Sequence, residues 1–182
     1  MKNIFPLHTA DDLFRMSHDG VRRELIRGEI REMPPAGAEQ GAITGTFHVR
    51  LGHHILERQL GRLFAAETGF LIARDPDTVR APDCAFVCAE RLPDPLPKKY
   101  LPLCPDLAVE TISPGDRAAA VHEKVSEWLQ SGVRLVWVLD TGQRTAAVHR
   151  AGTEMRVLGP GDYLDGEDVV PGFRIGVRDL WA

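Results

Sequence analysis

The sequence predicts a mixed α/β fold, in which helices flank a mixed β-sheet and a β-hairpin lies near the N-terminus. Two long stretches have apolar residues at helical spacing, and several short stretches have the apolar pattern of strands. These patterns follow one another in the order hairpin, helix, strands, helix, strands. The chain has 182 residues, 43% of them hydrophobic, without internal repeats or linkers. We therefore expect residues 1–182 to form a single domain.

The first part of the chain predicts a hairpin and a long helix. The segment ELIRGEIREM, from Glu24 to Met33, has two short alternating arms around Arg27 and Gly28, and the breaker PPAG follows it. Between Glu39 and Leu60 an apolar residue recurs at every fourth position: Ile43, Phe47, Leu51 and Ile55. This spacing predicts a helix over 39–60.

Strands and a second helix are predicted in the rest of the chain. RLFAAE, GFLIA and DCAFVCA are separated by turn residues, and a Pro-rich loop leads to the apolar segment PDLAVETISPGD. A helix is expected from about Asp116 to Gln130, because one apolar stripe runs along it and Gly132 is a typical stop: Val121, Val125, Trp128 and Leu129. VRLVWVLD and TAAVHR then flank a turn, and the tail has one candidate strand near 173–177.

The composition narrows the choice of partners. A formal net charge of -4 gives no general attraction to polyanions, so nucleic acid would need a local basic patch. The candidates for such a patch are Arg22, Arg23, Arg27, Arg31, Lys98 and Lys99. The three cysteines lack a paired C-x-x-C and indicate reduced thiols. The first residues turn acidic before any apolar run suited to a signal or membrane span, so we expect a cytoplasmic protein without a membrane anchor.

An isolated glutamate in an apolar strand is the first candidate for a functional residue. Glu110 lies within PDLAVETI, and a buried carboxylate is costly unless a partner compensates it. Strand alternation places it on one face with the small Ala108. Asp83 begins the preceding strand and has a small neighbour, Ala85, on its own face. Lys124 lies beside the apolar stripe of the second helix, so its ammonium group could reach both carboxylates.

Convergence of the two acids would require a cation. Two carboxylates about 4 Å apart repel each other by about 4 kcal/mol at an effective dielectric constant near 20. The repulsion raises the pKa of each carboxyl group unless positive charge lies between them. A divalent metal ion together with Lys124 would meet this need.

Four segments of the chain resemble the Uma2 (DUF820) family, a bacterial branch of the PD-(D/E)xK nuclease superfamily. They are PDCAFV, PDLAVETISPGDR, HEKVSEWLQSGVRLVWVLD and DGEDVVPGF, and the likeness extends over about 22–181. The resemblance implies a restriction-endonuclease-like core in which Asp83 and Glu110 bind Mg²⁺ and a lysine is the third catalytic group. Ile112 stands at the usual E-x-K lysine position. The lysine role therefore passes to Lys124 on the helix, an arrangement that the family tolerates.

The resemblance also implies a reaction. The implied activity is that of a DNA endonuclease, which hydrolyses phosphodiester bonds with Mg²⁺ or, as a substitute, Mn²⁺. In this reaction Lys124 would orient the attacking water. Glu24 in the hairpin is a candidate to support the metal ligands or to hold a second metal. Gln40 stands where the family often has a histidine at the start of the first helix. We therefore expect no catalytic step that depends on that histidine in this protein.

Each of these residues also has an ordinary structural explanation. Asp83 follows a proline, a common turn arrangement, and Lys124 is typical of a lysine at a helix edge. The alternative function is therefore a non-catalytic domain that binds a partner or serves as a scaffold, with the same residues as a buried ion network. A homodimer is compatible with either function. The spacing of His48, His53 and His54 does not suit a zinc site on one helix face.

Overall fold

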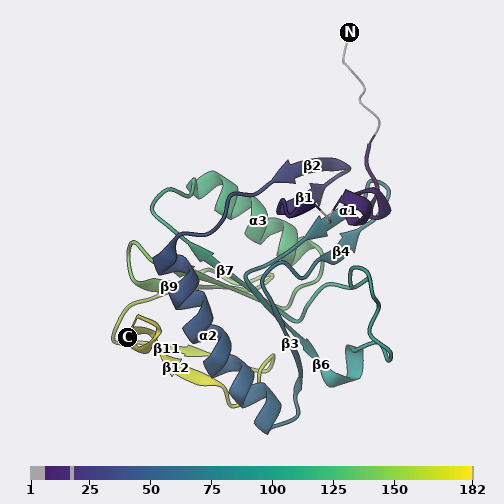
Figure 1. Ribbon diagram of the computed structural model, residues 1–182. Helices are drawn as coiled ribbons and strands as arrows, with labels where there is room; N and C mark the ends of the chain where they lie inside the picture. Colours follow the sequence, from purple (N-terminus) through teal and green to yellow (C-terminus); the bar gives the residue numbers. More distant parts are fainter. Residues whose placement is uncertain (1–6, 17–18, 182) are drawn as a thin grey trace.

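The computed structural model describes residues 7–16 and 19–181 and has a mixed α/β fold (Figure 1). Within these residues three α-helices surround the sheets: α1 (Ala10–Met16), α2 (Ala38–Glu57) and α3 (Ala118–Gln130). Short 3₁₀ helices lie at Ala89–Arg91 and Val177–Leu180. No helix in the described part of the chain is both long and apolar enough to cross a membrane.

The central sheet has six strands in the order β10-β9-β8-β7-β6-β3. Their bounds are β3 (Gly61–Ala65), β6 (Cys84–Cys88), β7 (Leu107–Ile112), β8 (Leu135–Asp140), β9 (Thr145–His149) and β10 (Arg156–Leu158). The central strands β7 and β8 are parallel, with α3 as the crossover between them, and the other neighbours are antiparallel. Both central strands are almost continuously apolar because helices cover both faces of the sheet.

The two long helices cover opposite faces of this sheet. Phe47 and Leu51 of α2 pack in one core with Leu107 and Val109 of β7. Trp128 and Val125 of α3 pack in another core with Ala108, which lies between Leu107 and Val109 in the sequence. Successive residues of a strand point to opposite faces, so β7 is buried from both sides. Figure 1 shows α2 crossing the front of the sheet and α3 behind it.

A second sheet of four strands, called the small sheet below, holds the predicted hairpin and has the order β2-β1-β5-β4. Its strands are β1 (Arg23–Ile26), β2 (Glu29–Glu32), β4 (Phe70–Ala73) and β5 (Thr78–Arg80). The turn between β1 and β2 has positive φ angles of 49° at Arg27 and 81° at Gly28, as expected for a tight hairpin. A third, two-stranded sheet of β11 (Tyr163–Asp165) and β12 (Arg174–Gly176) adds to the core under α2.

The structure corrects several predicted boundaries. The first helix ends at Glu57 and not at residue 60, because Gln59 has a positive φ of 52°. The second helix begins at Ala118, because Asp116 belongs to the turn before it and accepts hydrogen bonds from the amide and hydroxyl of Ser113. The elements α1, β5, β10 and β11 were not predicted, since each is too short to show a periodic pattern.

Candidate active site

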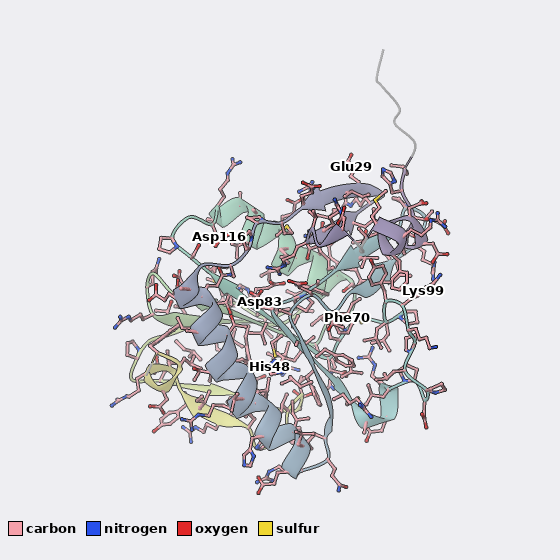
Figure 2. The ribbon with its side chains drawn as sticks, viewed as in Figure 1. Glu29, His48, Phe70, Asp83, Lys99 and Asp116 are labelled. Carbon is pink, nitrogen blue, oxygen red and sulfur yellow. The ribbon has the colours of Figure 1, made fainter. Side chains whose placement is uncertain are left out.

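Asp83, the residue directly before β6, lies beside Glu110 of β7. Cys84 of β6 pairs with Val109 of β7, so the antiparallel register brings the residue before Cys84 next to the residue after Val109. The backbone N–H of Thr111 donates a hydrogen bond of 2.7 Å to Oδ2 of Asp83 and fixes this carboxylate against β7. Figure 2 shows Asp83 near the centre of the molecule, among side chains from several elements. The two predicted acids therefore meet.

Helix α3 brings Lys124 to these acids. Its Nζ donates a hydrogen bond of 2.8 Å to Oε2 of Glu110 and lies 3.6 Å from Oε1 of Glu24. Trp128, one turn further along the helix, donates its indole N–H to Oε1 of Glu110 at 2.8 Å. Ile112, at the usual lysine position, packs on the apolar cluster beneath α3. The cation beside Glu110 thus comes from the helix, as the sequence predicted.

Glu24 is held by an arginine that the sequence did not indicate. Nη1 of Arg80 lies 2.6 Å from Oε2 of Glu24, and the backbone N–H of Ala81 donates to Oε1 at 3.0 Å. The same guanidinium donates from Nε to Oε2 of Glu127 on α3 at 2.8 Å. Pairing of Leu25 with Val79 places Glu24 and Arg80 side by side on β1 and β5. Only this pairing could have revealed Arg80, and β5 is too short to be predicted.

We refer to six of these side chains together as the acid–base network: Glu24, Arg80, Asp83, Glu110, Lys124 and Glu127. Arg80 joins the small sheet to α3, and Lys124 joins α3 to β7. The network thus connects three parts of the fold at one place. It contains four carboxylates and two basic side chains.

Gln40 lies beside the network but does not contact its carboxylates. Its Nε2 donates a hydrogen bond of 2.5 Å to the backbone carbonyl of Thr111. Thr44, one turn further along α2, donates its hydroxyl to Oγ1 of the same threonine at 2.8 Å. Gln40 therefore fixes the start of α2 to β7 next to Glu110.

All five predicted site residues line one cleft with a volume of about 580 Å³, open to solvent beside the β1–β2 hairpin: Glu24, Gln40, Asp83, Glu110 and Lys124. Of the six predicted basic residues, three line it as well: Arg22, Arg23 and Arg31. Two of these three are in ion pairs, because Arg22 contacts Glu67 at 3.0 Å and Arg23 contacts Asp19 and Glu32. The basic wall of the cleft is thus partly neutralised.

Comparison with known proteins identifies the family. The model of the Uma2 family, described as "Putative restriction endonuclease", matches residues 10–178. The chain belongs to the Uma2 family. The crystal structure of a "putative nuclease belonging to DUF820" from Anabaena variabilis ATCC 29413 superposes on this Uma2 chain with a TM-score of 0.83. The two are 20% identical over 95% of this chain and 97% of the other, a likeness that shows the fold. Comparison with curated proteins gives no match.

Burial and charge act differently on the acids of this Uma2 protein. Burial raises the pKa of Asp83 above its ordinary value, and it raises the pKa of Glu110 to about 7 despite the adjacent Lys124. Burial also acts to raise the pKa of Glu24, but Lys124 and Arg80 outweigh it and hold that pKa below the ordinary value. Glu24 therefore has enough positive charge around it, whereas Asp83 and Glu110 do not.

Lys124 itself stays charged. Burial favours its neutral form, but the carboxylates of Glu110 and Glu24 outweigh burial and raise the pKa of the ammonium group. A protonated Nζ has three N–H donors, and one of them is used by Glu110. Glu24 lies 3.6 Å from Nζ on another side, and Lys124 lines the cleft, so a donor can still face a group that enters the cleft.

The two undercompensated carboxylates fit a divalent cation. Mg²⁺ prefers oxygen ligands and keeps several waters, so one or two protein carboxylates are enough. Each carboxylate oxygen has two lone pairs, and the hydrogen bonds from Thr111, Lys124 and Trp128 use one lone pair on each of three oxygens. The described residues contain no group of three or more His, Cys, Asp or Glu side chains suited to a metal. A site here would thus rest on Asp83 and Glu110 alone.

Proposed function

We propose that this Uma2 protein is a Mg²⁺-dependent DNA endonuclease that hydrolyses phosphodiester bonds, with Mn²⁺ as a substitute metal. One observation carries the proposal: the buried carboxylate of Glu110 and the half-buried carboxylate of Asp83, both with raised pKa values, converge in an open cleft beside a charged lysine. Perturbed acids in a cleft are typical of functional sites. The family and the fold of its solved relative support the same reaction.

Four residues of the acid–base network have distinct parts in this proposal. Asp83 and Glu110 would hold the metal, which when bound polarises a phosphate oxygen and lowers the pKa of a bound water. Lys124 would orient the attacking water with the N–H donors that Glu110 does not use. Glu24 would hold Lys124 in place from the opposite side, since its own charge is satisfied by Arg80. Because Glu24 comes from the small sheet and Glu110 from the central sheet, we propose that both sheets act as one domain.

A scaffold function is the second candidate, and the network itself favours it. Arg80 and Lys124 each pair with two carboxylates, so the cluster connects three parts of the fold whether or not it performs chemistry. Metal binding separates the two functions, because a purely structural ion network has no need of a divalent cation.

Substitution of either proposed ligand tests the metal site. We expect Asp83→Asn and Glu110→Gln each to weaken Mn²⁺ binding at least tenfold in calorimetry and to abolish cleavage of plasmid DNA, because each removes an anionic ligand. Glu29→Gln is the charge-matched control, since Glu29 is an exposed acid on β2 outside the cleft (Figure 2). Equal Mn²⁺ affinity in the wild type and both ligand variants would exclude this metal site.

Binding of nucleic acid should be weak and sensitive to salt. The protein has a net charge of -4, and three of the four arginines that line the cleft already have acidic partners: Arg22, Arg23 and Arg80. We expect the logarithm of the affinity for a labelled DNA duplex to fall linearly with the logarithm of salt concentration, by about 0.9 per phosphate contact. Arg31→Gln should reduce this slope, whereas Lys98→Gln, outside the cleft, should not. Tight binding without a salt dependence would contradict the proposal.

A further inference from the structure

Both oxygens of Glu110 are held by donors from one helix. Lys124 binds Oε2 and Trp128 binds Oε1, each at 2.8 Å, from positions one turn apart on α3. Residues at this spacing lie on the same helix face, so both side chains approach the carboxylate from one side. The carboxylate of Glu110 is therefore fixed at two points.

The indole of Trp128 does more than fill space. Its side chain is 0% exposed and packs between α3 and the central sheet, next to the small Ala108. A phenyl ring would supply most of this packing but no donor. The indole N–H points at the carboxylate of a buried residue, where a hydrogen bond to an anion is stronger than one between neutral groups.

Trp137 provides an internal comparison. It is also 0% exposed and lies on the opposite face of the same sheet, packed against Phe47 and Phe173. Its Nε1 has no hydrogen-bond partner among the described residues. A tryptophan can thus be buried in this fold for its ring alone, which makes the placement of the Trp128 N–H informative.

We propose that Trp128 is a positioning residue that fixes the orientation of the Glu110 carboxylate for metal binding. The terminal torsion of a glutamate is broad and weakly restricted. With Lys124 as the only donor, the carboxylate could rotate about its hydrogen bond and turn its free lone pairs away from Asp83. With Trp128 as the second donor, the plane of the carboxylate is set. The meaning of this orientation for catalysis rests on the proposed endonuclease function, but the orientation itself does not.

The test compares Trp128→Phe with Trp137→Phe, the same change at two fully buried positions. Crystal structures of both variants without metal should show the Glu110 carboxylate displaced or in several conformations in Trp128→Phe only. Calorimetry with Mn²⁺ should show at least tenfold weaker binding for Trp128→Phe, and binding within twofold of wild type for Trp137→Phe. In cleavage assays kcat should fall in Trp128→Phe while KM for DNA stays unchanged.

An unmoved Glu110 in Trp128→Phe, or wild-type Mn²⁺ affinity in that variant, would overturn the positioning role. If no protein, wild type included, binds Mn²⁺, the proposed endonuclease function fails, and the metal-free structures still decide whether Trp128 orients Glu110. Should Trp128→Phe not fold, 3-benzothienylalanine at position 128 keeps the two-ring shape and replaces N–H by sulfur. The same displacement of Glu110 and loss of Mn²⁺ affinity are then expected.

Discussion

Substitution of Arg80 by methionine should lower the free energy of unfolding by about 3–5 kcal/mol, as expected when one partner of a buried ion pair is removed. Arg80 is 6% exposed and holds both Glu24 and Glu127, so its loss removes the cation of Glu127 and leaves Glu24 with Lys124 alone. Urea denaturation measures the change. Arg15→Met is the matched control, because Arg15 pairs with Asp12 at the surface and should change the free energy of unfolding far less than Arg80→Met.

A second comparison separates packing from charge at the same place. In the double variant Glu24→Gln with Arg80→Met, one of the two acids that had paired with Arg80 is gone, so the loss should be smaller than in Arg80→Met alone. A double variant less stable than Arg80→Met would contradict this expectation and show that Lys124 and the N–H of Ala81 compensate Glu24 without Arg80. The difference in the free energy of unfolding between the single and the double variant measures how much the interaction of Arg80 with Glu24 contributes to stability.

Substitution of Lys124 by methionine should reduce DNA cleavage by about 10²- to 10³-fold, the usual effect of removing one preorganised electrostatic group from an active site. Methionine keeps most of the packing of the lysine side chain but removes the charge that Glu110 and Glu24 share. Stability should fall as well, because these carboxylates are buried. Cleavage rates are therefore compared at a temperature at which circular dichroism shows each protein to be folded.

Lys98→Met is the control for general loss of positive charge, since Lys98 is exposed in the Pro-rich loop outside the cleft. It should change DNA affinity at most and leave kcat unaltered. Unchanged cleavage by folded Lys124→Met would exclude Lys124 as the catalytic cation. The scaffold function would then be favoured.

Much of the candidate site was accessible from the sequence because it depends on strand patterns. Glu110 stands out as a charge within a nearly continuous apolar strand, and Asp83 directly precedes the neighbouring strand β6. The apolar stripe of the second helix placed Lys124 on the side that packs on the sheet. The structure brings these three residues together, although their roles in metal binding and catalysis stay predictions.

Hydrogen-bond partners from elements far apart in the chain could not be predicted from the sequence. Arg80 is separated from Glu24 by 56 positions and contacts it only because β1 pairs with β5. Trp128 looked like a packing residue of the apolar stripe. A buried tryptophan usually finds a partner for its N–H, but the partner cannot be named until the helix is docked on the sheet.

The sequence by itself determined the local elements and the acids and lysine that stand out from them, because helical and strand periodicity and the cost of burying charge are local properties. Only the tertiary structure decided which charges compensate each other. Docking of α3 and of the small sheet on β7 gives Glu24 two cations but leaves Asp83 and Glu110 with raised pKa values. This difference arises from distances between residues far apart in the chain, since electrostatic interaction depends on separation and burial and not on order in the sequence.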